Sequence, residues 1–250
     1  MVRILIFLIC MCSYSQTVQS IKLPKNYERK VHDPYHSWII KQKISFAPVK
    51  YYTGEYVMND SYAKLDYDIG NENLHQCADA TIYLHAKYNF DTNNLDKIKY
   101  HFTNGMIYSY NKYLQGYRPV VNHDNWESKI VKTSIEVDNN YKNLKKYLVI
   151  IWTWAGTLSL ETYDTVKVYT DPKPGDMFIN GGSPGHVFNV IDKIISPWGE
   201  NLYMLAQSWM PAQEQEILIN FRTDTPWFTL EDIEYYLGFN KRTLKKFTNE

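Results

Sequence analysis

Residues 71–88 read NENLHQCADATIYLHAKY, and this stretch decides which fold class the chain belongs to. Apolar side chains recur in it at spacings of three and four residues. The main stripe consists of Cys77, Ala80, Leu84 and Tyr88. That period predicts an amphipathic helix that carries a single cysteine near its N-terminus. Asn71 and Asn73 are the candidate N-caps, so Cys77 is expected in or near the first or second turn.

β-Strands are expected mainly after this helix. A turn cluster at residues 171–176, DPKPGD, precedes three short β-like runs at residues 177–180, 187–195 and 202–207. Pro197-Trp198-Gly199 separates the last two runs, which predicts an antiparallel hairpin. Further expected elements are strands at residues 63–69, 97–103 and 216–221 and a helix at residues 140–154. Because helices precede a run of strands, the order favours an α+β fold over a parallel βαβ sheet.

The composition is that of an ordinary folded protein. The chain has 250 residues, with 27 Lys and Arg against 27 Asp and Glu, 44% apolar residues and 22% charged residues. These values argue against a disordered chain and against a polybasic protein that binds nucleic acid. The 22 Tyr and 7 Trp can pack a core or line a cleft for sugars or peptides. Residues 16–250 are expected to form one domain, with an irregular lead-in over residues 16–60.

The first fifteen residues have the pattern of a secretory signal peptide. A positive start with Arg3 is followed by nine apolar residues, 4–12, and then by the small residues Ser13 and Ser15. An apolar run of this length is too short to span a bilayer. We therefore expect cleavage after Ser15 and an exported protein, periplasmic or extracellular, with no stable membrane insertion. An uncleaved N-terminal anchor is the alternative.

Export would leave the mature chain with one cysteine. Cys10 and Cys12 lie within residues 1–15, so Cys77 remains alone and no intramolecular disulfide is possible. A lone thiol is either a buried small hydrophobe or a reactive group. Near a helix N-terminus, unpaired N–H groups and the helix dipole favour a thiolate. A helix that begins at residues 74–76 would therefore lower the pKa of Cys77.

A second segment supplies a candidate base for this thiol. Residues 181–187 read GGSPGHV and place His186 at the head of a strand, after a glycine-rich turn. A histidine in such a place is open to a ligand and can take a proton from a thiol on a packed helix. A purely structural histidine is the alternative.

A third group should orient the imidazole of His186. If the hairpin turns at residues 198–199, position 186 faces position 211, and alternation puts Gln207, Trp209 and Gln213 on the same face as His186. Gln207 is the preferred partner because it lies in the more β-like stretch, and Gln213 is the reserve. Asp192 is a further option near the far end of the hairpin. The alternative is that both glutamines are ordinary surface groups.

Three motifs share their order with a known group of enzymes. The chain has Gln76-Cys77-Ala78-Asp79, Gly175-Asp176-Met177 and His186-Val187-Phe188. This order resembles the papain-like cysteine hydrolases of the NlpC/P60 type, which carry Asp-Cys-Ser-Gly on a helix and Gly-Asp-Leu before a His-Val-Gly strand. The resemblance implies a cysteine-bearing helix packed on an antiparallel sheet. The chain departs from the pattern at Gln76, and its long separation of the first two motifs requires a helical insertion that includes residues 140–154.

A closer resemblance covers nearly all of the mature chain. Its main motifs are QCADA at residues 76–80, GGSPGH at residues 181–186 and LAQSWMPAQ at residues 205–213. The chain resembles an uncharacterised bacterial family of exported proteins that is known only as a domain of unknown function. It departs from that family at His85, where an Arg-rich helix is usual, and at Gln215, where a histidine often occurs. Membership brings no established activity with it.

Two functions from different classes remain open. The first is a secreted cysteine hydrolase that cleaves an amide or ester, in the class of cell-wall peptides, through Cys77, His186 and Gln207. The other predicted site residues are Gln76, Asp79 and Gln213 as oxyanion or auxiliary groups, and Ser183 and Trp209 as parts of the cleft. The second is an inactive module that binds a glycan or peptide on the same scaffold. No cofactor or metal is expected, because one thiol and scattered histidines have no ligand spacing and GGSPG lacks the Lys-Ser/Thr of a phosphate loop.

Overall fold

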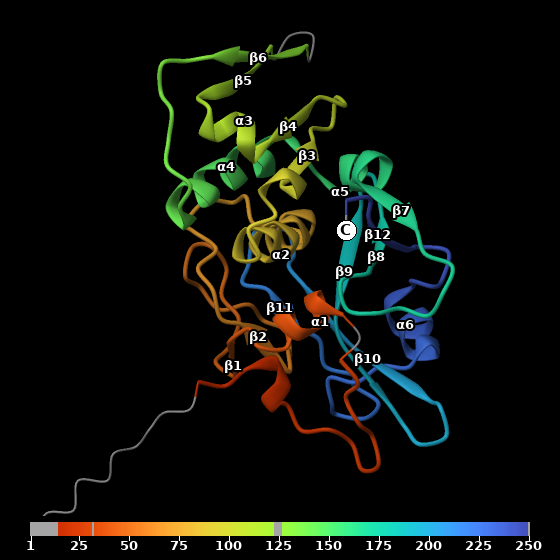
Figure 1. The fold of residues 1–250 in the computed structure, drawn as a ribbon. Helices are drawn as coiled ribbons and strands as arrows, with labels where there is room; N and C mark the ends of the chain where they lie inside the picture. The colour runs from red at the N-terminus through yellow and green to blue at the C-terminus, as the bar shows by residue number, and fades with distance from the viewer. Residues whose placement is uncertain (1–14, 32, 123–126, 250) are drawn as a thin grey trace, which may run out of the picture.

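A computed structural model describes residues 15–31, 33–122 and 127–249. These residues form a mixed α+β fold built on one large antiparallel sheet (Figure 1). The predicted signal peptide, residues 1–15, lies almost wholly outside the described residues. Within the described ranges, no helix has both the length and the apolar character needed to cross a membrane.

The main sheet has eight strands in the order β1-β2-β11-β10-β9-β8-β12-β7, and all its neighbours are antiparallel. Its strands are β1 Ile44–Ser45, β2 Ala63–Leu65, β7 Thr165–Lys167, β8 Met177–Asn180, β9 His186–Ile195, β10 Asn201–Gln207, β11 Glu216–Ile217 and β12 Leu244–Phe247. Two small sheets pair β3 Lys99–His101 with β4 Ile107–Ser109 and β5 Tyr117–Val121 with β6 Ser128–Lys132. The helices are α1 Pro34–Ile39, α2 Cys77–Asp91, α3 Tyr110–Leu114, α4 Tyr141–Trp154, α5 Thr157–Ser159 and α6 Leu230–Leu237, with a π-helical turn Leu160–Asp164 after α5.

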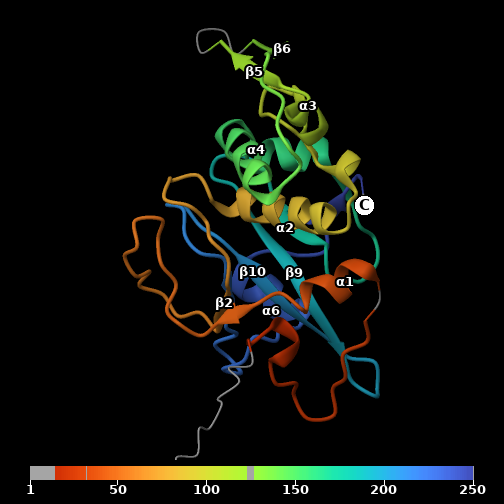
Figure 2. The same cartoon turned by 60° about the vertical axis from the view of Figure 1, so that its left-hand side comes forward.

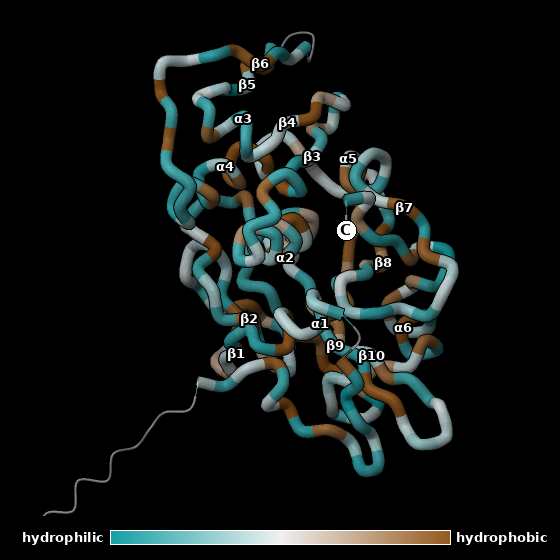
Figure 3. The backbone as a smooth tube through the Cα atoms, viewed as in Figure 1, coloured by the Kyte–Doolittle hydropathy of each residue, from teal (hydrophilic) through white to brown (hydrophobic). Residues whose placement is uncertain are grey.

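The longest strand, β9, lies near the middle of the sheet and buries side chains on both faces. Val187 and Ile191 belong to the larger apolar core, and Phe188 and Val190 belong to a second core on the opposite face. A bulge between Met204 and Leu205 of β10 shifts the register. Figure 3 shows hydrophobic stretches along β9 and β10 and hydrophilic residues in the long loops.

Different helices cover the two faces of the sheet. Helices α2 and α4 contribute Ile82, Leu84, Leu148 and Ile151 to the larger core, and α2 packs directly on β9. Residues 78–86 of α2 are all buried, so the prediction that this helix is amphipathic was wrong. Helix α6 contributes Ile233 to the second core. Figure 2 shows α2 and α4 on one side of β9 and β10, with α6 behind them. This arrangement brings the N-terminus of α2 to the start of β9.

Most elements expected from periodicity are confirmed. The helix expected at residues 140–154 is α4, whose N-cap Asn140 accepts a hydrogen bond from the Asn143 backbone N–H at 3.0 Å. The hairpin is formed by β9 and β10. The strands expected at residues 63–69, 97–103 and 216–221 exist but are shorter. The segment expected as an irregular lead-in contributes α1 and β1 to the fold.

The predicted caps of α2 were wrong. The helix begins at Cys77 and its N-cap is Gln76, not Asn71 or Asn73. Asp79 provides the cap from inside the helix, because its Oδ2 accepts the Gln76 backbone N–H at 2.9 Å. The side chain of Asn73 is used elsewhere. Its Oδ1 accepts the backbone N–H of Ala212, in the loop after β10, at 2.7 Å.

Candidate functional site

Cys77 is the first residue of α2, so the helix begins one residue after the range 74–76 that the thiolate prediction assumed. It is a free, half-buried cysteine. Gln76 before it has an extended backbone, so the chain turns sharply into the helix at this point. The backbone N–H groups of the first turn have no partners within the helix and lie beside the thiol.

His186 is the first residue of β9 and follows the glycine-rich loop. Two glycines of this loop are required by close packing against α5 and the π-helical turn after it. A Cβ on Gly185 would collide with the Thr157 hydroxyl, and a Cβ on Gly181 would lie 2.6 Å from the Glu161 carboxylate. The loop therefore closes tightly on α5, and His186 is half-buried at its end.

Three side chains form a hydrogen-bonded row across neighbouring strands. His186 Nε2 lies 2.6 Å from Gln207 Oε1 on β10, and Gln207 Nε2 donates to Glu216 Oε1 on β11 at 2.7 Å. An amide oxygen only accepts, so Nε2 of His186 carries a proton. The neutral ring then has its free lone pair on Nδ1.

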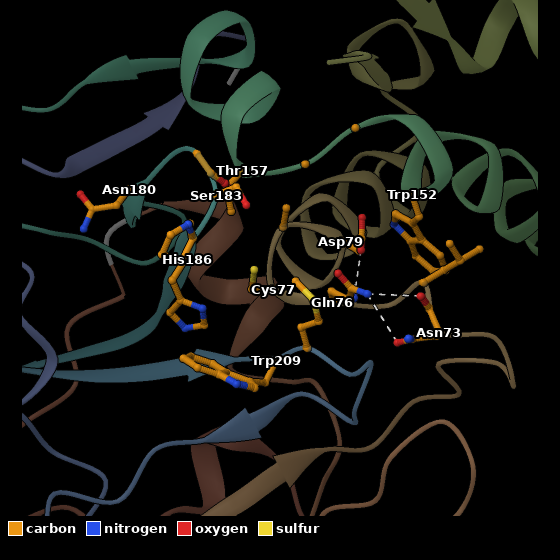
Figure 4. A pocket seen from close by; sticks show the side chains of 18 of the residues that line it. Asn73, Gln76, Cys77, Asp79, Trp152, Thr157, Asn180, Ser183, His186 and Trp209 are labelled. Atoms are coloured by element: carbon orange, nitrogen blue, oxygen red, sulfur yellow. Dashed lines mark hydrogen bonds between the residues drawn. The ribbon is translucent and has the colours of Figure 1, made fainter. Parts of the chain in front are cut away.

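Cys77 and His186 line one cavity of about 590 Å³. Figure 4 shows the Cys77 sulfur and the His186 imidazole in this cavity, with the Trp209 indole beneath them. The ring centroids of His186 and Trp209 are 4.2 Å apart. Of the other predicted site residues, the cavity lining contains Gln76, Asp79 and Ser183.

The surroundings of Cys77 do not activate its thiol. Burial, followed by the nearby Asp79 carboxyl, raises its pKa to about 11, while the backbone N–H groups of Ala78, Cys77 and Val187 act in the opposite direction. The helix end lowers this pKa as expected, but the expected net decrease was wrong, because the cost of desolvating a thiolate exceeds the benefit of the helix end. The effect of the Val187 N–H also shows that the sulfur lies next to the start of β9.

The imidazole of His186 is neutral at physiological pH. Burial lowers its pKa to about 4, and the hydrogen bond to Gln207 opposes this change without reversing it. A neutral imidazole and a protonated thiol therefore face the same cavity. The pair can act only by transferring the thiol proton to the ring during a reaction, since neither group is charged beforehand.

Gln76 and Asp79 occupy the cavity wall at the start of α2. The Gln76 side-chain amide donates to the backbone oxygen and Oδ1 of Asn73 at 3.3 and 3.4 Å. Asp79 is 5% exposed, and its Oδ1 is buried with no hydrogen-bond partner among the described residues. Burial also raises the pKa of Asp79 well above its usual value. The hydrogen bond from the Gln76 backbone N–H opposes this rise.

Two candidates for orienting His186 lie elsewhere. Gln213 is buried and donates to Glu216 at 3.3 Å. Asp192 is fully buried in the second half of β9. The expected pairing of position 186 with position 211 was wrong, because Ala206 pairs with Asn189 and the same register puts position 209 opposite 186. Next to the turn, Asn201 faces Ile195, which is already one residue out of the expected register, and the bulge adds one more.

Sequence reasoning missed four residues of this region. They are Trp152, Phe239 and Met210 in the cavity lining and Glu216 behind Gln207. Glu216 lies in a stretch where apolar and polar residues alternate only weakly. Trp152 and Phe239 are distant in sequence from Cys77 and His186. The exposed pair Trp209-Met210 directly after β10 was the one available signal, because large apolar residues next to a candidate base often line a cleft.

The described residues contain no group of three or more His, Cys, Asp or Glu side chains arranged to hold a metal ion. His75, the histidine nearest to Cys77 in sequence, is buried, and its Nε2 lies 3.1 Å from the Tyr67 hydroxyl.

Residues 18–246 match the family described as domain of unknown function 4846, so the chain belongs to that family. No curated protein and no solved structure matched it. The family carries no assigned activity, and the chemistry of the cavity must be argued from its own residues.

Proposed function

We propose that this protein is an exported cysteine hydrolase of the papain-like, NlpC/P60-related kind that cleaves an amide or ester bond. One observation carries the proposal. A cysteine at a helix N-terminus shares a cavity with a histidine whose far nitrogen is held by a glutamine amide. Nucleophile, base and orienting group are the parts that acyl transfer by a thiol requires.

The reaction would proceed by general-base attack. The proton of Cys77 Sγ passes to Nδ1 of His186 as the sulfur bonds to the acyl carbon and the carbonyl electron pair moves onto oxygen. Collapse of this intermediate expels the amine or alcohol, which takes the proton from Nδ1 and leaves a thioester. Water then attacks the thioester, gives a proton to Nδ1 and releases the acid, and the proton returns to Sγ.

The developing oxyanion needs hydrogen-bond donors near the sulfur. The backbone N–H of Cys77 is one, and the side-chain amide of Gln76 is the second. Gln76 holds only long hydrogen bonds to Asn73 and can release them at small cost. We assign the oxyanion site to these two groups.

The substrate class is a peptide or a glycan-linked peptide. A cavity of about 590 Å³ accommodates a few residues rather than a whole protein surface. Trp209 is 48% exposed at its rim and offers a flat apolar face of the kind that binds peptide side chains or sugars. Together with the expected export, these features favour cell-wall peptides.

A second candidate is a binding module without catalysis. The raised pKa of Cys77 supports it, because a thiol that stays protonated is a poor nucleophile. The aromatic and apolar wall formed by Trp209, Met210 and Phe239 would serve such a module equally well.

Replacement of Cys77 by Ser distinguishes a hydrolase from a binding module. Wild-type and variant chains would be assayed on p-nitrophenyl esters and on purified muropeptides, with products detected by mass spectrometry. A hydrolase loses turnover by a factor on the order of 10³ or more in the variant, because a serine without further activation is a far weaker nucleophile. Its melting temperature stays nearly unchanged. Equal turnover by the two chains would overturn the assignment.

Alkylation by iodoacetamide gives an independent test. In a hydrolase the thiol of the folded chain is accessible from the cavity, and its alkylation slows when His186 is replaced by Ala. A thiol that is silent until denaturation supports the binding module. A labelled chain that binds muropeptides but never cleaves them supports it as well.

A further inference from the structure

Glu216 lies directly behind the Gln207–His186 pair, out of contact with the cavity. It is the first residue of β11 and is 1% exposed. Its carboxyl group receives three side-chain amide donors: Gln207 Nε2 at 2.7 Å, Asn59 Nδ2 at 3.1 Å and Gln213 Nε2 at 3.3 Å.

Amides rather than cations compensate this carboxylate. Within the described residues Glu216 makes no ion pair. Lys64, its cross-strand neighbour on β2, bonds instead to the Glu214 carboxylate. Burial raises the pKa of Glu216, and the three amide hydrogen bonds counteract that rise. A buried carboxylate surrounded by donors is held as an acceptor.

An acceptor in this position determines which way the Gln207 amide faces. A carboxylate cannot donate, so Gln207 must turn its NH₂ group toward Glu216. The amide oxygen is then left facing His186. Because that oxygen cannot donate either, the imidazole must present an N–H to it, and the ring is held as the tautomer protonated on Nε2.

We propose that Glu216 is a positioning residue that selects the His186 tautomer with a free lone pair on Nδ1. It acts through Gln207 and touches neither the thiol nor the cavity. The role in catalysis rests on the proposed hydrolase, but the tautomer itself is a property of the folded chain and is measurable without any substrate. Asn59 and Gln213 fill the remaining acceptor positions of the carboxylate and stop it from rotating.

The test replaces Glu216 by Gln. A glutamine amide can present either its NH₂ or its oxygen to Gln207, so the amide of Gln207 is free to flip and the ring is free to change tautomer. The ring-nitrogen signals of His186 would be recorded at pH 7 on chains with ¹⁵N-labelled histidine, and assigned by loss in His186→Asn. The wild type is expected to show the Nε2–H form, and Glu216→Gln a mixture with at least several-fold more of the Nδ1–H form.

Glu214→Gln is the matched control. It makes the same chemical change two residues away, on a side chain that bonds to Lys64 and not to Gln207. Its His186 spectrum should equal that of the wild type. If Glu216→Gln does not fold, Glu216→Asp keeps the charge but withdraws the acceptor from Gln207, and the same shift toward the Nδ1–H form is expected.

The outcomes separate this inference from the proposed function. If turnover exists, Glu216→Gln should lower kcat about tenfold with KM within a factor of two. A tautomer shift in chains that hydrolyse nothing supports the positioning role and removes the hydrolase. An unchanged Nε2–H tautomer in the folded Glu216 variants overturns the positioning role, whether or not the wild type is active.

Discussion

A histidine lies beside a polar partner at the start of β9 and another in its second half, and the first of them lines the cavity that contains Cys77. At the start of the strand, His186 bonds to a neutral amide and shares open space with Cys77. In the second half, Asp192 bonds to His36 Nε2 at 2.8 Å and to Arg29 at 2.7 Å, with both Asp192 and His36 fully buried.

The two histidines therefore differ in the charge of the partner as well as in their access to the cavity. The Asp192 cluster has the stronger electrostatic pairing, but none of its three residues lines the cavity that contains Cys77. It joins the N-terminal segment and α1 to the middle of the sheet. The His186 end has the weaker partner and keeps its ring neutral, which is the state that a proton acceptor needs.

The largest effect that separates the two ends should come from Asp192. Replacing it with Ala leaves the Arg29 guanidinium and the His36 ring without their buried partner, at a cost of about 3–5 kcal/mol in the free energy of unfolding. The melting temperature should fall by about 10 °C. Urea unfolding followed by tryptophan fluorescence measures the change. Any turnover per folded molecule should be unaffected, and a loss of turnover without a loss of stability would reverse the roles assigned to the two ends.

Gln207→Leu should have the next largest effect, and this effect should be on kcat rather than on stability. The imidazole of His186 loses the acceptor that fixes its tautomer, so kcat should drop by a factor on the order of 10². The loss of stability should be smaller than for Asp192, since no charge loses an ionic partner. Kinetics on the substrate found for the wild type would measure it, with Gln215→Leu as the control, because the Oε1 atom of that glutamine accepts the Tyr67 hydroxyl instead. Equal kinetic losses in both variants would show a packing effect rather than an orienting one.

The hairpin offers a smaller and matched contrast between two exposed tryptophans. Trp209 is 48% exposed at the cavity, and Trp198 is 68% exposed in the turn at the opposite end. Trp209→Ala should weaken substrate or ligand binding about tenfold, because an aromatic contact contributes about 1–1.5 kcal/mol. Trp198→Ala should leave binding unchanged. Isothermal titration with muropeptides measures both, and equal affinities for the two variants would remove Trp209 from the cleft.

The same contrast explains how much could be predicted from the sequence. The helical period around Cys77 and the hairpin that carries His186 and Gln207 are local patterns, and both were predicted with the correct element type. The cap of α2 was missed because Asp79 caps it from inside the helix. The role proposed for Glu216 was missed because it depends on the order of β9, β10 and β11 in the sheet. The irregular loop between β10 and β11 hides this order in the sequence.

The pKa of Cys77 could not be predicted from position alone. Its place at the helix N-terminus is as expected, but the sign of the shift depends on how much water reaches the sulfur. Asp79, two residues further along the same helix, adds a second unfavourable contribution. Desolvation is a property of the packed molecule, and no local period reports it.

The smallest predicted effect is the loss of activity at acid pH. Its size depends on whether the partner of His186 is a neutral amide or a carboxylate. His186 must be unprotonated to accept the thiol proton, and burial lowers its pKa to about 4. Activity should therefore rise with pH through about 4 and be level above about 5. Between pH 7.5 and 5.5, kcat/KM should change by less than about twofold, whereas a histidine with the ordinary pKa of about 6.5 would lose about tenfold. A carboxylate partner would raise the pKa and move the acid limb upward. A limb found near pH 6.5 would show that the ring is better solvated, or paired with a charge, in the working enzyme.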